Sequence, residues 1–165
     1  MDTFTQSIPR IALIGIGATA VMDAWLLLLR RLGVPTLDFA LLGRWVGHMA
    51  RGTWSHPAIA KAAPIRHEAA IGWLAHYATG IAFAAVLVGL FGSDWTGAPT
   101  LVPALLVGVA TVAAPWLVMQ PAMGAGIAAS RTPKPATNRL RSLANHTVFG
   151  IGLYLAAAFI ERTLK

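Results

Sequence analysis

The sequence contains no cysteine, and this absence removes several kinds of chemistry at once. Without thiols the chain forms no disulfide, no thiolate metal site and no iron–sulfur cluster, and it has no cysteine nucleophile. Serines are few, and none lies in a recognisable catalytic motif. The residues therefore favour a binding or transport role over an enzymatic one. An enzyme would need a metal or haem to supply its chemistry.

Charged residues are scarce as well. They make up 12% of the chain, against about 25% in ordinary soluble domains, while 56% of the residues are hydrophobic. A soluble protein this apolar would aggregate, whereas a helical membrane protein needs this balance. We therefore predict an all-α membrane protein in which residues 1–165 form a single integral membrane domain.

Four apolar runs are long enough to cross a bilayer as helices, which takes about 20 residues. The predicted spans are 11–29, 69–91, 101–119 and 143–160. Pro115 lies inside the third span and should kink that helix, because proline removes one backbone hydrogen bond and frees the carbonyl of Thr111. Residues 121–141 are rich in Gly, Ala and Pro, which predicts a loop.

The connection after the first span carries an amphipathic pattern. Leu37, Leu41 and Trp45 fall on one helical face, which predicts a short helix in this first cytoplasmic connection. Two interpretations of that helix remain open. It lies in the membrane interface, or it packs on the ends of the spanning helices.

The basic residues set the orientation. Ten of the thirteen cations lie in the connections after the first and third spans. They are Arg30, Arg31, Arg44, Arg51, Lys61, Arg66, Arg131, Lys134, Arg139 and Arg141. The connection between the second and third spans holds Asp94 and no cation. By the positive-inside rule the basic connections are cytoplasmic and both termini face outward.

The net charge of +7 is then a topology signal, and no nucleic-acid partner is predicted. The expected partner is the lipid bilayer. Arg131, Arg139 and Arg141 are candidates to face lipid phosphates or an anionic ligand.

One pattern occurs twice. His76-Tyr-Ala-Thr-Gly80-Ile81 and His146-Thr-Val-Phe-Gly150-Ile151 lie in the second and fourth spans. The first and third spans also match, since Gly17 precedes Trp25 by the same spacing as Gly108 precedes Trp116. This predicts two helical hairpins of equal orientation, related by a pseudo-twofold axis along the membrane normal. Asp23 aligns with Ala114, so the histidine is duplicated but the acid is not.

Polar residues at membrane depth are costly and mark candidate sites. At about 1.5 Å per helical residue, His76 lies roughly 12 Å past Glu68, His146 roughly 8 Å past Arg141 and Asp23 roughly 10 Å before Arg30. In a ring of four helices the second and fourth are diagonal, so the two histidines would face each other across the axis.

Asn145 and Gln120 lie near the same level. The candidate ligand- or proton-binding residues are therefore Asp23, His76, His146, Asn145 and Gln120.

Several interpretations of these residues remain open. Asp23, His76 and His146 suit a divalent metal in the two-His-one-carboxylate manner. Two axial histidines beside glycines suit a b-type haem. In the remaining alternative the histidines have no functional role, and each ring donates to a carbonyl or hydroxyl on a neighbouring helix and so holds the helices together. His48, His56 and His67 lack compact ligand spacing and are expected to be interfacial or solvated.

Five segments together resemble a known family. They are Gly17-Ala-Thr-Ala-Val-Met-Asp23, Gly43-Arg-Trp-Val-Gly-His48, Trp73-Leu-Ala-His76-Tyr, Met119-Gln-Pro-Ala-Met-Gly-Ala-Gly-Ile-Ala-Ala-Ser-Arg131-Thr-Pro and His146-Thr-Val-Phe-Gly-Ile-Gly-Leu153. They are similar to the blocks of a bacterial inner-membrane family known only as a domain of unknown function. The resemblance covers nearly the whole chain. It implies a four-helix, multi-pass protein of the bacterial cytoplasmic (inner) membrane and implies no activity.

The residues favour a protein that binds or conducts a small ligand, ion or proton at the Asp/His cluster. A haem- or divalent-metal-binding protein is the first alternative. A structural or accessory subunit of a larger membrane complex is the second, because Gly- and Ala-rich faces suit partner helices. A homodimer is also expected, because four helices alone rarely enclose a transport path.

Overall fold

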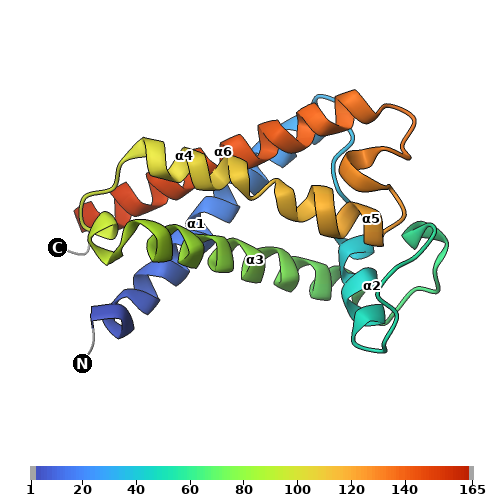
Figure 1. The fold of residues 1–165 in the computed structure, drawn as a ribbon, viewed down its shortest axis with the longest axis horizontal. Coiled ribbons are helices and arrows are strands. Elements are labelled where there is room, and N and C mark those ends of the chain that lie inside the picture. Colours follow the sequence, from blue (N-terminus) through green and yellow to red (C-terminus); the bar gives the residue numbers. More distant parts are fainter. Residues whose placement is uncertain (1–2, 164–165) are drawn as a thin grey trace. The chain divides into compact units, whose positions relative to one another are not determined.

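The computed structural model describes residues 3–163, and every regular element within them is helical (Figure 1). The α-helices are α1 (Thr3–Arg31), α2 (Phe39–Met49), α3 (Glu68–Phe91), α4 (Leu101–Ala110), α5 (Gln120–Ala122) and α6 (Pro135–Thr163). Single turns of 3-10 helix form η1 (Ile59–Lys61), η2 (Ser93–Thr96) and η4 (Ile127–Ala129), and η3 (Pro115–Met119) is a π-helix. The predicted all-α class is confirmed.

Within residues 3–163, four helical segments are long and apolar enough to cross a membrane. They are Ile8–Arg31, Glu68–Phe91, Leu101–Ala122 and Pro135–Thr163. Each contains one of the predicted spans, 11–29, 69–91, 101–119 and 143–160, so their number and order are confirmed. By length and composition the chain is therefore a multi-pass membrane protein.

The prediction of a loop over residues 121–141 is wrong for its last third. Helix α6 begins at Pro135, eight residues before the predicted span. Proline suits the first turn of a helix, where its missing N–H is not needed. The residues that follow, through Arg141, include good helix formers. Hydropathy locates only the apolar part of a helix, so the polar first turns of α6 are not predicted.

The predicted disturbance at Pro115 is confirmed. Helix α4 ends at Ala110, and the π-helix begins at Pro115. Because proline has no N–H, it cannot donate to the carbonyl of Thr111. The chain continues instead with wider turns, in which the Gln120 N–H donates to the Pro115 carbonyl.

The chain folds into two compact units. Unit 1 comprises Met1–Pro35, Tyr77–Thr111 and Ala144–Lys165, and unit 2 comprises Thr36–His76 and Val112–Leu143. Helices α3 and α6 each begin in unit 2 and continue into unit 1 without a break.

In unit 1, helices α1 and α3 touch backbone to backbone. A Cβ atom added to Gly15 would lie 2.5 Å from the Ile81 Cα and 2.9 Å from the Gly80 carbonyl oxygen. Thr19 is 1% exposed beside this contact, and its hydroxyl donates to the Gly15 carbonyl over 2.8 Å. Such close approach is available only to residues without a side chain, as is common between helices in lipid.

Helix α6 makes two further close contacts within unit 1. A Cβ on Gly108 of α4 would lie 2.6 Å from the Gly150 nitrogen and 2.9 Å from the His146 carbonyl oxygen. On another face of α6, a Cβ on Gly152 would lie 2.9 Å from the Ala18 Cα of α1. Helix α6 therefore packs closely against both α4 and α1.

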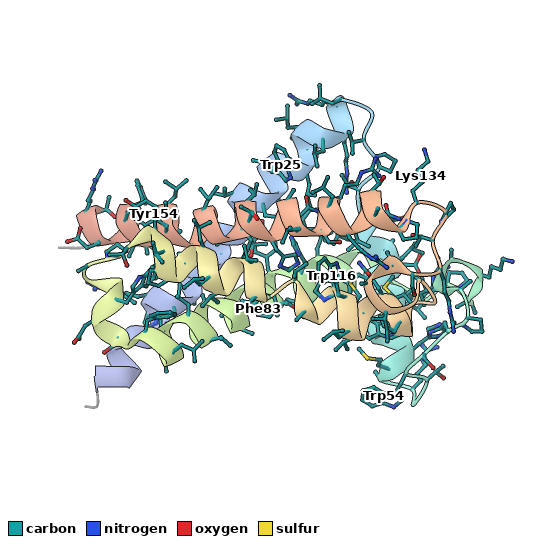
Figure 2. The ribbon with its side chains drawn as sticks, turned by 45° about the horizontal axis from the view of Figure 1, so that its top comes forward. Trp25, Trp54, Phe83, Trp116, Lys134 and Tyr154 are labelled. Carbon is teal, nitrogen blue, oxygen red and sulfur yellow. The ribbon has the colours of Figure 1, made fainter. Side chains whose placement is uncertain are left out.

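Large side chains fill the space around these contacts. Ile14, Leu87 and Leu153 are each at most 1% exposed. Phe83, labelled in Figure 2, meets Phe149 with ring centroids 6.1 Å apart. The core of unit 1 thus combines contacts between small residues with interlocking aliphatic and aromatic side chains.

In unit 2, α2 crosses the first turns of α3. The helix begins after Asp38, whose carboxylate accepts a hydrogen bond from the Ala40 N–H over 2.9 Å. A Cβ on Gly43 would lie 2.5 Å from the Gly72 nitrogen, so the two backbones touch here as well. Phe39 is 5% exposed and stacks on Trp73 with ring centroids 4.4 Å apart.

We predict that Gly108→Ala destabilises the protein by about 1–3 kcal/mol, because the new methyl group overlaps the backbone of α6. Gly89→Ala is the matched control, since a Cβ there meets nothing within 4 Å. Thermal unfolding of both variants in one detergent would measure the difference. Equal melting temperatures for both would contradict this account of the α4–α6 contact.

Candidate functional site

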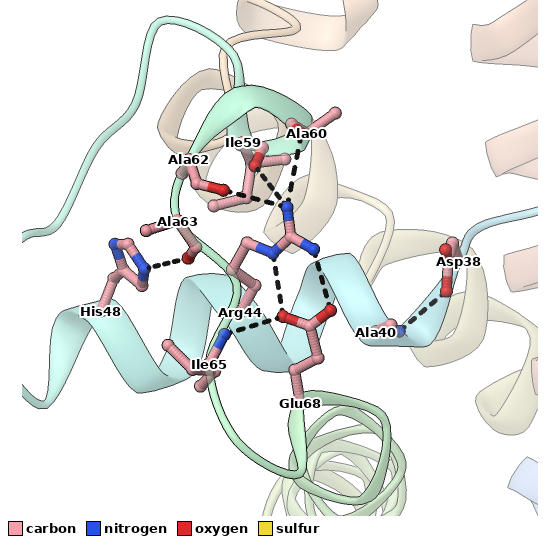
Figure 3. A network of polar contacts seen from close by, with 10 residues as sticks. All are labelled: Asp38, Ala40, Arg44, His48, Ile59, Ala60, Ala62, Ala63, Ile65 and Glu68. Carbon is pink, nitrogen blue, oxygen red and sulfur yellow. Dashed lines mark hydrogen bonds and ion pairs between the residues drawn. The ribbon is translucent and has the colours of Figure 1, made fainter.

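Unit 2 contains a polar network built on Arg44 and Glu68 (Figure 3). The Arg44 Nε donates to Glu68 Oε2 over 2.9 Å, and its Nη2 donates to Oε1 over 2.8 Å. The two side chains are only 13% and 19% exposed. Paired, nearly parallel hydrogen bonds of this kind fix the geometry of both groups as well as their charge.

The remaining Arg44 nitrogen, Nη1, points at carbonyl oxygens of the connection after α2. It lies 3.5, 3.3 and 3.1 Å from the carbonyls of Ile59, Ala60 and Ala62. Glu68 completes the network by accepting the Ile65 N–H over 3.1 Å. One guanidinium therefore ties this connection to α2 and to the start of α3. The hydrogen bond to Glu68 raises the pKa of Arg44, which keeps it charged.

His48 and His56 form a second chain of hydrogen bonds in unit 2. His48 Nε2 lies 2.9 Å from the Ala63 carbonyl, and His48 Nδ1 lies 2.9 Å from His56 Nε2. A carbonyl only accepts, so His48 Nε2 carries hydrogen. In the neutral pair His48 Nδ1 then accepts from His56 Nε2–H, which leaves the lone pair of His56 on Nδ1.

Three buried side-chain atoms of unit 2 lack a hydrogen-bond partner within residues 3–163. They are His56 Nδ1, Trp116 Nε1 and Gln120 Oε1. The loop that carries His56 is held against the α5 region, because the His56 N–H donates to the Ala122 carbonyl over 2.7 Å. Unsatisfied buried polar atoms are rare and costly. Trp116 belongs to the π-helix η3, and Gln120 directly follows it.

The backbone of unit 2 is also strained at several points. His67, Ala128 and Ala129 have φ angles of 60°, 47° and 60°, which non-glycine residues rarely adopt. Each such residue costs of order 1–3 kcal/mol and persists only where its surroundings hold it. Unit 2 therefore contains three backbone positions whose unfavourable conformation depends on the contacts around them.

In unit 1 the predicted site residues meet partners on neighbouring helices. Asp23 of α1 accepts a hydrogen bond from the Tyr77 hydroxyl of α3 over 2.8 Å. Asn145 of α6 accepts from the Trp25 indole of α1 over 3.0 Å. All four side chains are partly buried. Each pair joins α1 to another helix through polar groups at spanning depth.

His146 of α6 pairs with Thr111, the residue that follows α4. The Thr111 hydroxyl donates to the Gly108 carbonyl over 2.6 Å and lies 2.8 Å from His146 Nδ1. A hydroxyl has one hydrogen, so both contacts hold only if His146 Nδ1 donates to Thr111. The lone pair of neutral His146 then lies on Nε2, the nitrogen that accepts protons or binds cations.

The other predicted residues belong to unit 2. His76 packs against Phe39 with ring centroids 4.4 Å apart, and against Trp73 at 6.0 Å. Gln120 donates through Nε2 to the Ser142 hydroxyl over 3.4 Å.

Among the predicted anion-facing residues, Arg139 donates to the Ala128 carbonyl over 2.8 Å, and Arg131 is exposed. Arg141 is partly buried.

The predicted centre of Asp23, His76 and His146 stays a prediction, since Asp23 and His146 lie in unit 1 and His76 lies in unit 2. The metal and haem interpretations depend on that centre and stay predictions with it. Within residues 3–163 no three His, Asp or Glu side chains are grouped so that they could hold a metal ion.

The sequence does not assign these polar residues to their partners. Tyr77 follows the repeated histidine directly, and Thr111 lies three residues after the repeated Gly108, so position offered a signal for both. Arg44 and Glu68 are 24 residues apart on different helices, and no local pattern joins them.

We predict that Arg44→Lys loosens the connection between α2 and α3, because lysine cannot bond Glu68 through two nitrogens and reach the carbonyls together. Amide hydrogen exchange should become faster over residues 59–65 and stay unchanged in unit 1. Arg66→Lys, at an exposed position, is the control. Wild-type exchange in Arg44→Lys would show that the network does not hold this segment.

We also predict that His48 and His56 both carry hydrogen on Nε2 when neutral. Long-range proton–nitrogen NMR correlations of histidine-labelled protein at alkaline pH would identify the protonated nitrogen of each ring. His67→Gln removes one set of signals and helps to assign the rest. An Nδ1–H tautomer at His48 would contradict the hydrogen-bond chain to Ala63.

One of three comparisons with known proteins gave a match. No curated protein and no solved structure matches the chain. A family model described as "Protein of unknown function (DUF2938)" matches residues 12–160, which cover most of every spanning helix and the greater part of the chain. The resemblance to a family of unknown function, noted from five sequence segments, is thereby confirmed. The chain belongs to the DUF2938 family of proteins of unknown function.

Proposed function

We propose that this protein resides in the bacterial inner membrane and binds or conducts protons through the polar residues of its spanning helices. The observation that carries the proposal is the Asp23–Tyr77 hydrogen bond of 2.8 Å between α1 and α3. Asp23 lies eight residues before Arg31, so it is about 12 Å from the end of α1. An acid at that depth is expensive, and proteins that keep one generally use it.

The chemistry of the partners favours a proton over a larger ligand. A carboxylate, a phenol and an imidazole each exchange protons, and in unit 1 each is hydrogen-bonded to a group on another helix or at its end. The lone pair on His146 Nε2 adds a base of the kind that proton relays employ. A proton needs one acid or base at a time, whereas a metal ion needs several ligands grouped together.

The two-hairpin repeat is part of this proposal. Gly15 contacts Gly80 and Ile81 where α1 meets α3, and Gly108 contacts Gly150 where α4 meets α6. Gly80 and Gly150 are the glycines of the repeated pattern, and each makes a backbone contact with the preceding spanning helix, although the partner Gly15 is not the residue that aligns with Gly108. This supports two hairpins of similar build, each with a polar pair beside its glycine contact.

The short helix predicted in the first cytoplasmic connection corresponds to α2. Its buried residues are Phe39 and Gly43, which face α3. We place α2 at the cytoplasmic interface of the membrane, where its opposite face meets head groups. Its cap at Asp38 and its network at Arg44 support a fixed position for this helix.

We predict that Asp23→Asn abolishes proton flux in liposomes that contain a pH-sensitive dye, because the amide cannot take up and release a proton there. Flux should fall to the level of protein-free liposomes. Asp94→Asn is the control, since Asp94 lies on an exposed connection. His146→Gln tests the second hairpin in the same assay.

Two outcomes would reject the proposal. The first is wild-type protein that carries no more protons than protein-free liposomes. The second is a clear wild-type flux that Asp23→Asn leaves unchanged.

A further inference from the structure

The fold gathers nearly all of the excess positive charge in unit 2. This unit contains eight of the thirteen cations and two of the six acids, so it carries +6 of the net charge of +7. The cations are Arg44, Arg51, Lys61, Arg66, Arg131, Lys134, Arg139 and Arg141, and the acids are Asp38 and Glu68. Unit 1 is close to neutral by comparison.

The hydrogen bonds sort these charges into two groups. Arg44 is bound to Glu68 and to three carbonyls, and Arg139 is bound to the Ala128 carbonyl. Asp38 caps α2, so both acids of the unit have structural tasks. Arg141 is partly buried, and the exposed cations besides Arg139 are Arg51, Lys61, Arg66, Arg131 and Lys134. No acid of unit 2 is left to neutralise these five cations, so their side chains attract anions.

A large aromatic side chain accompanies the exposed cations. Trp54 is 68% exposed and lies three residues after Arg51, on the connection that follows α2 (Figure 2). The loop is fixed, because the Trp45 indole donates to the Trp54 carbonyl over 2.9 Å and the Thr53 N–H donates to the His48 carbonyl over 3.0 Å. An exposed tryptophan next to cations is typical of the boundary between lipid and water.

We propose that the exposed cations of unit 2, together with Trp54, bind the head groups of anionic phospholipids. Lipid fits better than a soluble polyanion for two reasons. Tryptophan inserts favourably at the head-group level, and the cations lie close in sequence to apolar helices. Arg66 is two residues before α3, and Lys134 directly precedes α6. The proposal is independent of proton transport, since none of its residues lies in unit 1.

Native mass spectrometry of the detergent-solubilised protein tests this directly. The wild type should retain phosphatidylglycerol more strongly than phosphatidylcholine, and this preference should weaken as salt screens the charges. The double variant Arg51→Gln/Lys61→Gln should bind phosphatidylglycerol about tenfold more weakly, because each cation near an anionic lipid surface contributes to binding. Arg10→Gln/Arg162→Gln removes the same charge from unit 1 and should retain the preference.

Trp54 provides a second measurement in nanodiscs. Brominated lipids quench tryptophan at the interface, so the wild type should lose more fluorescence than Trp54→Phe, with the difference larger in phosphatidylglycerol. Equal retention of both lipids by the wild type would overturn the proposal, as would an equal loss in the unit 1 control. Displacement of phosphatidylglycerol by a short RNA at lower concentration would also overturn it, in favour of a soluble polyanion.

Discussion

Close approach between helix backbones decides which polar groups of this protein can pair. Threonine and histidine side chains are short, so they meet across two helices only where the helices touch. Gly108 and Gly150 bring α4 and α6 into backbone contact, and the Thr111–His146 bond lies within one turn of that point. In lipid no water replaces a missing partner, so the glycine contacts and the polar pairs depend on each other.

In unit 2, backbone carbonyls outside the helices also need hydrogen-bond donors, and a side chain provides them. Pro57 and Pro64 interrupt the connection after α2, so most of its carbonyls receive no hydrogen bond from a helical N–H. The guanidinium of Arg44 supplies donors to three of these carbonyls while it pairs with Glu68. One buried cation thus replaces the hydrogen bonds that a longer helix would have made. The exposed cations are left to interact outside the protein.

The sequence predicts those features that depend on local composition. Length and hydropathy locate the four spans, and Pro115 marks the disturbance that becomes the π-helix. The polar start of α6 at Pro135 is missed, because it is helical without being apolar.

For the site, the sequence identifies Asp23, Asn145 and His146 but not their partners Tyr77, Trp25 and Thr111. Which side chains pair across two helices depends on how the helices are rotated and how far apart they lie. The small residues at the contacts set this geometry, and the pattern within one helix does not reveal it. The Arg44–Glu68 network could not be predicted from the sequence either, because an irregular connection separates the two residues.

In the proposed two-hairpin repeat, the difference between the halves bears on how a proton would move. If both halves carried an acid, the proposed path would have two equivalent entrances. Asp23 lies instead in an unbroken helix, while its aligned counterpart Ala114 directly precedes Pro115 and the π-helix. A carboxylate at position 114 would fall where the backbone is already irregular and hard to satisfy in lipid. In the proposed repeat, the acid in one half and the distorted helix in the other are therefore alternative departures from a common pattern, and of these two only the acid is a titratable group.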